Sequence, residues 1–218
     1  MIPLLLFGLG CVHRDDPVVS GDVQVTSDGS TQVSASACLD ADFLDCNGAT
    51  TMLELVHDGT ATPMPYDGFL FPDHHCVAPL GNPAKDFDVT NNFVHARMTL
   101  PPPFELASTL DGDELPASAT LHLAWEPGDS PMRWDANYDC DASGFAGASV
   151  GGSVDDGAGT LAIDGDKLVD LIGKDHLAGG CTVTIDVLRV LEGDMDKQFP
   201  ATLATGIQSR ALTFRLVQ

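Results

Sequence analysis

The sequence predicts an all-β protein built from small β-sandwiches, and three observations support this fold class. Several short runs alternate apolar and polar residues with a period of two, which is typical of strands with one buried face. The 218 residues include 22 Gly and 14 Pro, so turns are frequent and elements are short. A helical spacing of apolar residues is found in residues 164–172, and no other segment sustains one.

The first half of the chain contains several strand candidates separated by turn signals. The clearest covers residues 93–100, whose even-numbered residues from Val94 to Leu100 are all apolar. The other candidates are residues 23–25, 32–37, 52–56 and 68–71. Three consecutive prolines follow at positions 101–103, and proline fits neither a sheet interior nor a helix because it lacks an N–H donor. We therefore place a domain boundary there, between an N-terminal β domain (22–100) and a C-terminal domain (101–218).

The second half has a more regular pattern. Its longest strand candidate begins at Cys181 and runs to residue 191, with Val183 and Val187 on the same face as Cys181. The alternation then breaks because Arg189 occupies the apolar position, so we expect a β-bulge near Leu188 or an exit from the core. Other predicted strands are residues 119–125, 132–138, 159–163 and 206–217, with a loop or weak strand over 143–152. About seven short strands fit an immunoglobulin-like sandwich.

The chain is strongly acidic, with 32 Asp and Glu against 10 Lys and Arg and a net charge of −22. Binding to nucleic acid and attraction to anionic membranes both depend on Lys and Arg. The charge therefore argues against a nucleic-acid partner and leaves a lipid anchor as the expected contact with a membrane. A solvated acidic surface is the default interpretation.

Residues 1–21 are predicted to be a signal peptide, a lipidation site and a tether. The apolar run over residues 2–9 is too short to span a bilayer but fits the apolar region of a signal peptide. Small residues then precede Cys11, and this pattern resembles the lipobox of bacterial lipoproteins, in which the cysteine becomes lipid-modified. Val12 follows, which by the sorting rule of Gram-negative lipoproteins implies the outer membrane. Cleaved secretion or a periplasmic location is the alternative.

The cysteines predict disulfides, because an exported protein meets an oxidising compartment. With one cysteine assigned to lipid, Cys140 and Cys181 form the best pair, since each flanks a strand candidate in the same half. Cys38 and Cys46 lie close together around an acidic turn and form the second candidate pair. That scheme leaves Cys76 over, although a bond from Cys76 to either of them is an open alternative.

Several motifs of the second half occur in a fixed order. They are the proline-rich lead into Phe104, the strand ending at Trp125, Trp134, Cys140, Asp155-Asp156-Gly157, the segment 181–193 and Ser209-Arg210. Together they resemble the C-terminal domain of uncharacterised surface lipoproteins of myxobacteria and related Gram-negative bacteria. The resemblance covers about half of the chain, and its motifs are structural. It implies a β-sandwich and a surface location, and it implies no activity.

Two groups of residues are candidates for metal binding. His74-His75-Cys76 carries the imidazole and thiolate groups that suit zinc or copper, and His57 or His95 could join it. Adjacent residues of a strand point to opposite faces, so at most two of the three can share an ion.

The second group is acidic and would bind calcium. Asp139 and Asp141 match the start of an EF-hand loop, but Val150 stands where that loop needs Glu. Solvated acidic turns are the default interpretation, so no cofactor is expected, and irregular calcium sites at these residues or at other acidic turns are the alternative. The other turns contain Asp111, Asp113, Asp155 and Asp156.

Residues 147–151 match the G-x-S-x-G pattern of hydrolases, with Ser149 as the nucleophile. The Gly- and Asp-rich residues that follow cannot begin the helix that this motif requires, so we interpret the match as a glycine-rich loop. A binding module would instead need exposed aromatic side chains, for which Phe93 and Tyr66 are the outward candidates. The sequence therefore predicts a non-enzymatic cell-envelope lipoprotein with a structural, adhesive or partner-binding role. Its partner would be an unknown protein or surface ligand. An envelope metal-binding protein and a secreted serine hydrolase are the alternatives.

Overall fold

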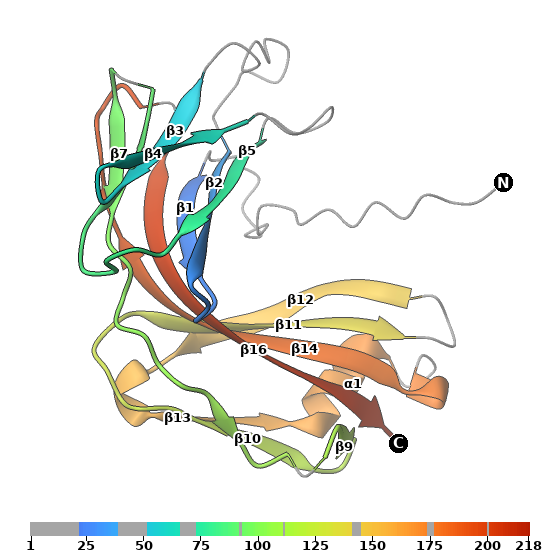
Figure 1. The fold of residues 1–218 in the computed structure, drawn as a ribbon. Coiled ribbons are helices and arrows are strands. Elements are labelled where there is room, and N and C mark those ends of the chain that lie inside the picture. The colour runs from blue at the N-terminus through green and yellow to red at the C-terminus, as the bar shows by residue number, and fades with distance from the viewer. Residues whose placement is uncertain are drawn as a thin grey trace, which may run out of the picture.

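The computed structural model describes residues 22–38, 52–65, 73–91, 93–110, 112–140, 145–173, 177–199 and 201–218. The chain is all-β, as predicted, and the strands of the described residues form three sheets (Figure 1). The predicted helix is confirmed as α1 (Gly165–Ile172), which ends where the N–H of Gly173 donates to the carbonyl of Val169. In the described part of the chain, no helix has the length and apolar character needed to cross a bilayer.

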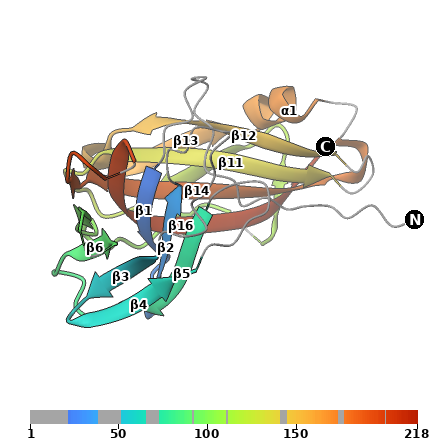
Figure 2. The ribbon, with the colours of Figure 1, turned by 90° about the horizontal axis from the view of Figure 1, so that it is seen from above.

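The largest sheet has eight strands and draws on both halves of the chain. Its order is β12-β11-β14-β16-β1-β2-β5, and β9 pairs with the end of β16. Seen from above, β12, β11, β14 and β16 run side by side (Figure 2). The strands are β1 (Asp22–Ser27), β2 (Gln32–Cys38), β5 (Asp73–Pro79), β9 (Glu114–Pro116), β11 (Met132–Cys140), β12 (Phe145–Val154), β14 (Cys181–Glu192) and β16 (Leu203–Val217).

Two smaller sheets pack against the large one. The five-stranded sheet has the order β15-β7-β6-β3-β4, and the three-stranded sheet has the order β13-β10-β8. Their strands are β3 (Leu53–His57), β4 (Thr60–Met64), β6 (Phe87–Thr90), β7 (His95–Met98), β8 (Ala107–Ser108), β10 (Thr120–Ala124), β13 (Thr160–Asp164) and β15 (Asp194–Met195). Strands β4, β5 and β6 were not predicted, because their alternation of apolar and polar residues is too short. The predicted strand at residues 68–71 lies outside the described residues.

Two hydrophobic cores form on the same face of the large sheet. The first lies between β1, β2, β5 and the five-stranded sheet, and the second between β11, β14, β16 and the three-stranded sheet. Ala204 belongs to the first core, whereas Phe214 and Leu216 belong to the second. All three lie at even positions of β16, whose register with β14 is continuous, so they share one face. In the sequence, the proline segment 101–103 falls between residues of the first core and residues of the second. Strand β16, however, runs along both cores (Figure 1).

The long buried strand is confirmed as β14, but the bulge predicted near Leu188 is wrong. Its register with β16 continues without a shift as far as Glu192. Arg189 keeps its place on the core-facing side and is only 4% exposed, because it pairs there with Asp156. The irregularity lies instead between β11 and β12, at Ala136–Tyr138.

The interpretation of residues 147–151 as a loop is also wrong, because they lie within β12 at one edge of the large sheet. At Gly151, an added Cβ would lie 2.2 Å from the Trp134 carbonyl oxygen and 2.3 Å from Asp135 Oδ1. The pairing of β11 with β12 therefore requires a residue without a side chain at this position. Glycine therefore permits the close approach of β11 and β12, whereas in the sequence alone the glycines suggested turns.

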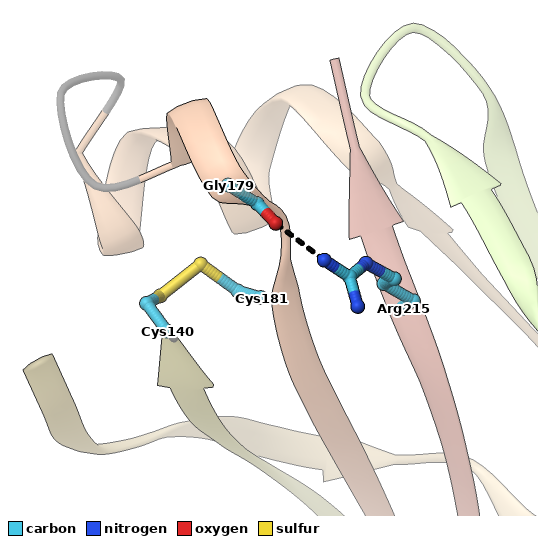
Figure 3. The surroundings of a disulfide bond; sticks show 4 residues. All are labelled: Cys140, Gly179, Cys181 and Arg215. Atoms are coloured by element: carbon cyan, nitrogen blue, oxygen red, sulfur yellow. Dashed lines mark hydrogen bonds between the residues drawn. A yellow bond between two sulfur atoms is a disulfide. The ribbon is translucent and has the colours of Figure 1, made fainter. Parts of the chain in front are cut away.

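The predicted disulfide between Cys140 and Cys181 is confirmed (Figure 3). It joins the end of β11 to the start of β14 within the second core. Beside it, the Arg215 guanidinium donates a hydrogen bond from β16 to the Gly179 carbonyl, which fixes the turn that leads into β14 (Figure 3). The predicted Cys38–Cys46 bond involves Cys46, which, like Cys11, lies outside the described residues.

Candidate functional site

Strand β5 separates the three residues of the predicted zinc or copper cluster. His74 and Cys76 are buried on the core side, whereas His75 is exposed on the other face. His74 Nδ1 lies 3.0 Å from the Met64 carbonyl oxygen, and His75 Nε2 lies 3.1 Å from Ser34 Oγ. Cys76 is a free thiol, and burial raises its pKa to about 11. Within the described residues, no group of three or more His, Cys, Asp or Glu side chains could hold a metal ion.

The predicted calcium residues are placed in different environments. Asp113 and Asp139 are exposed, while Asp111 and Asp141 lie outside the described residues. Asp155 caps the 3-10 turn that follows β12, because its Oδ1 accepts a hydrogen bond from the Gly157 N–H at 3.0 Å. Asp156 is buried, and its carboxylate faces Arg189.

Arg189 and Asp156 form a buried ion pair next to the second core. Arg189 donates to Asp156 Oδ1 from Nη2 at 2.8 Å and from Nε at 3.1 Å. The Trp125 indole N–H donates to the same oxygen at 3.0 Å, and the Ser130 backbone N–H donates to Oδ2 at 3.2 Å. Both carboxylate oxygens are therefore hydrogen-bonded, which offsets the cost of burying the charge.

The same arginine fastens the proline segment to the large sheet. Its Nη1 donates to the carbonyls of Pro102 and Pro103, at 3.3 and 3.4 Å. Two guanidinium groups contact the Phe104 ring, whose centroid lies 4.8 Å from Arg189 Cζ and 5.2 Å from Arg210 Cζ. A pocket of about 260 Å³ opens beside these residues. Because the arginine and the carboxylate already bind each other and the neighbouring backbone, the arrangement is a structural clamp. The sequence analysis did not predict this clamp. Its one indication in the sequence was Arg189, a charged residue at a core-facing position of the strand.

The hairpin between β6 and β7 presents the aromatic side chain that the sequence analysis expected to point outward. Phe93 is 88% exposed. The loop that carries it is held from within, because Asn91 Oδ1 accepts hydrogen bonds from the N–H groups of Phe93 at 3.1 Å and Val94 at 3.2 Å. The Thr90 hydroxyl also donates to the Val94 carbonyl at 2.9 Å, and Val94 is buried. The phenyl ring therefore projects into solvent, while the backbone of Phe93 is hydrogen-bonded to Asn91.

Hydrogen bonds also join the base of this hairpin to neighbouring segments. The His95 N–H donates to Asp196 Oδ2 at 2.9 Å, and the Asp196 N–H donates back to the His95 carbonyl at 2.9 Å. His95 Nδ1 lies 2.8 Å from Asp88 Oδ2 on the neighbouring strand. The position of Phe93 is thus set by contacts to β6, to its own loop and to the segment after β15. Tyr66, the other outward candidate, lies outside the described residues.

Comparison with known proteins gives no family for this chain. No protein-family model matches it, and no curated protein sequence matches it. Dimeric latent PorU from Porphyromonas gingivalis is similar at 12% identity and a TM-score of 0.29, over 96% of this chain and 20% of that one. The native conformation of E. coli alpha-2-macroglobulin is similar at 9% identity and a TM-score of 0.26, over 89% of this chain and 14% of that one. The chain thus spans a fifth or less of these proteins, and likeness at this level carries no functional argument.

Proposed function

We propose that this protein is a non-enzymatic lipoprotein of the cell envelope that binds a partner through the β6–β7 hairpin. The observation that carries the proposal is Phe93, whose ring is 88% exposed while its own backbone N–H and that of Val94 donate to Asn91 Oδ1. Burying such a ring against a partner is worth about 1.5–3 kcal/mol. Exposed aromatic residues are typical anchors of protein interfaces, and a backbone that is already hydrogen-bonded loses less conformational entropy on binding.

The placement of Ser149 supports a binding role over catalysis. The nucleophile motif of hydrolases needs a sharp turn from a strand into a helix. Residues 147–151 lie instead inside β12, and the strand continues to Val154 before a short 3-10 turn. A serine-reactive probe is therefore expected not to label Ser149.

Site-specific crosslinking on intact cells tests whether the β6–β7 hairpin binds a partner. Benzoylphenylalanine in place of Phe93 is expected to give one discrete crosslinked species on irradiation. The same photoreactive residue at Met52 or Val77, which are also exposed, is the matched control and is expected to give none. Equal crosslinking at all three positions, or none at Phe93, would contradict a specific role for the hairpin.

The envelope location is tested separately at the predicted lipidation site. Cys11→Ser is expected to move the protein from the membrane fraction to the soluble fraction. Val12→Asp keeps the cysteine but changes the residue that governs sorting, so it is expected to shift the protein from the outer to the inner membrane. A Cys11→Ser protein that stays fully membrane-bound would refute the lipid anchor and leave the hairpin result untouched.

A further inference from the structure

The edge of the large sheet at β12 carries unpaired backbone groups. This strand of ten residues lies at one end of the strand order and, within the described residues, its backbone bonds only to β11 (Figure 2). In an antiparallel pair, alternate residues direct their N–H and C=O groups away from the partner strand. The outer side of β12 therefore presents a row of donors and acceptors on which another strand can pair.

Other sheet edges of the described chain are protected, whereas this one is not. At the opposite end of the same sheet, the His75 N–H of β5 donates outward to the Pro65 carbonyl at 3.2 Å. In the five-stranded sheet, edge strand β4 contains Pro63, and edge strand β15 has only two residues. Proline, charged side chains and short length are the usual means of blocking an edge, and β12 has none of them.

On the core side of this edge, glycine leaves a tryptophan uncovered. The register shift of β12 lies before residue 150, so residues 150–154 pair regularly with residues 132–136 and place Gly152 opposite Trp134. Trp134 packs against the second core but is only half-buried, and Gly152 is exposed. A Cβ at Gly152 would lie 3.5 Å from Trp134 Nε1, so the indole reaches over the edge strand. An apolar side chain of an added strand could pack against this ring.

The opposite face of the same edge is acidic. The Asp135 side chain lies over Gly151, where an added Cβ would come within 2.3 Å of Asp135 Oδ1. Asp135 is close to Arg133, whose Nε lies 3.8 Å from its Oδ2, but Asp186 lies directly across on β14. Two carboxylates thus face one guanidinium group, and β12 itself supplies no Lys or Arg. A basic side chain of an added strand would be attracted to this face.

We propose that residues 150–154 bind an extended segment of a partner protein, which adds to the large sheet as a further strand. The segment has apolar side chains at the positions facing Trp134 and Lys or Arg at the alternate positions facing Asp135. A second copy of this chain fits poorly, because its β12 brings no basic residue and each copy has a net charge of −22. The site lies on a different sheet from Phe93 and does not depend on the proposed role of the hairpin.

The test uses a synthetic seven-residue peptide of alternating Val and Lys as the probe. Hydrogen exchange of the backbone amides of residues 150–154, followed by NMR of the full chain, measures binding. Exchange of the outward-facing amides is expected to slow about tenfold when the free peptide is at ten times its Kd. A peptide with Pro in place of the central Val is expected to give no such protection. Absence of protection by the Val and Lys peptide would overturn the proposal.

The charge preference has a matched peptide and a matched pair of variants. A peptide of alternating Val and Glu is expected to bind about tenfold more weakly, because attraction to Asp135 becomes repulsion. Ser153→Lys adds a positive charge on the Asp135 face of β12 and is expected to weaken the Val and Lys peptide about fivefold. Thr60→Lys changes the net charge equally at an exposed position of another sheet and should bind as the parent does. Equal binding of the two peptides, or equal weakening in the two variants, would contradict recognition at this edge.

The apolar contact is tested first without changing the protein. A peptide of alternating Ala and Lys is expected to bind about tenfold more weakly than the Val and Lys peptide, because less apolar surface is buried. Trp134→Ala should then reduce this preference for Val. Equal binding of the Ala and Val peptides by the parent would refute the contact with Trp134, whether or not the variant folds.

Analytical ultracentrifugation without peptide tests the alternative occupant. The protein is expected to sediment as a monomer, and the outward-facing amides of residues 150–154 should exchange at the same rate at every protein concentration. A dimer that forms with concentration and protects these amides would show that a second copy occupies the edge, and would overturn the proposal. Crosslinking at Phe93 is read independently of either result.

Discussion

The Arg189 guanidinium lies 2.8 Å from the Asp156 carboxylate, and the two side chains are 4% and 2% exposed. This ion pair links the core-facing side of β14 to the 3-10 turn after β12. Because Arg189 also binds the carbonyls of Pro102 and Pro103, it connects the segment between the two cores to the large sheet.

Removing one partner of this pair is expected to destabilise the protein strongly. Arg189→Met leaves the Asp156 charge buried without its counter-ion, which should lower the free energy of unfolding by about 3–5 kcal/mol. Chemical denaturation monitored by tryptophan fluorescence measures the change. The control is Lys167→Met, which removes an exposed ion pair to Asp164 and should cost less than about 1 kcal/mol. Equal losses in the two variants would show that the buried pair contributes no more than a surface one.

The disulfide is expected to stabilise the second core by restricting the unfolded chain. It closes a separation of 41 residues, for which chain entropy gives about 3–5 kcal/mol. The Cys140→Ala/Cys181→Ala double variant should lose free energy of unfolding in that range. Adding a reductant should then destabilise the parent protein and leave the double variant unchanged. A variant that equals the oxidised parent in stability would contradict this contribution.

Cys76 is expected to be unreactive in the folded protein. Burial raises the pKa of its thiol to about 11, so little thiolate exists at neutral pH, and the sulfur is shielded from reagents. Iodoacetamide at pH 8 should modify it only after denaturant is added, as read by mass spectrometry of the peptide that contains Cys76. Rapid alkylation under native conditions would mean that β5 opens readily.

Asp186 is expected to reduce stability at neutral pH. Burial raises the pKa of its carboxyl, and the Asp135 charge directly across on β11 raises it further, against a smaller effect of the Asn137 hydrogen bond. A raised folded pKa means that the folded state binds the proton more tightly than the unfolded state does. Stability from this group is therefore gained as the pH falls through the folded pKa toward the ordinary value of 3.8.

The corresponding variant is Asp186→Asn, which should be more stable than the parent at pH 7 and should lose the gain on acidification. Asp28→Asn is a control of opposite sign, because hydrogen bonds from Ser30 hold the pKa of Asp28 below its ordinary value. Urea unfolding between pH 4 and pH 7 measures both. An Asp186→Asn protein with unchanged pH dependence would rule out repulsion between the two carboxylates.

Phe93 and Phe87 lie on the same hairpin and should respond to substitution in opposite ways. Phe93→Ala should leave the free energy of unfolding within about 0.5 kcal/mol of the parent, since the ring contributes no burial. Phe87 is 0% exposed, and Phe87→Ala should cost about 3–5 kcal/mol. Thermal or urea denaturation distinguishes them. A large loss from Phe93→Ala would show that the ring supports the fold and would remove the basis for a binding role.

Local patterns predicted the strands that alternate for several residues, because one buried face repeats at every second position. Cys181 and Cys140 could be paired for the same reason: each lies at the end of a recognisable strand. The role of Arg189 could not be predicted, because its partner Asp156 lies 33 residues earlier in a turn that resembles a solvated acidic loop. β12 could not be distinguished from a loop because glycine, which fits the close approach of Trp134 and Asp135, is also the common residue of turns.

The candidate sites depended even more on contacts between distant residues. His57 is one of seven histidines, and its sequence context does not reveal the Asp86 carbonyl oxygen that lies 3.1 Å from its Nδ1. Phe93 could be expected to point outward from the parity of its strand. The hydrogen bonds that Asn91 accepts from Phe93 and Val94 could not be predicted, because they form only in the folded hairpin.

The shared strand β16 also determines how the molecule bears force. β1 runs parallel to β16 over six residue pairs, from Asp22↔Leu203 to Ser27↔Gln208. A pull on Asp22 along β1 loads the hydrogen bonds of this ladder together, in shear, and does not open them one at a time. From β16 the load passes into β14 along twelve further pairs. Tension applied at Asp22 is therefore spread over the eight-stranded sheet, so β1 separates only when its whole ladder with β16 breaks.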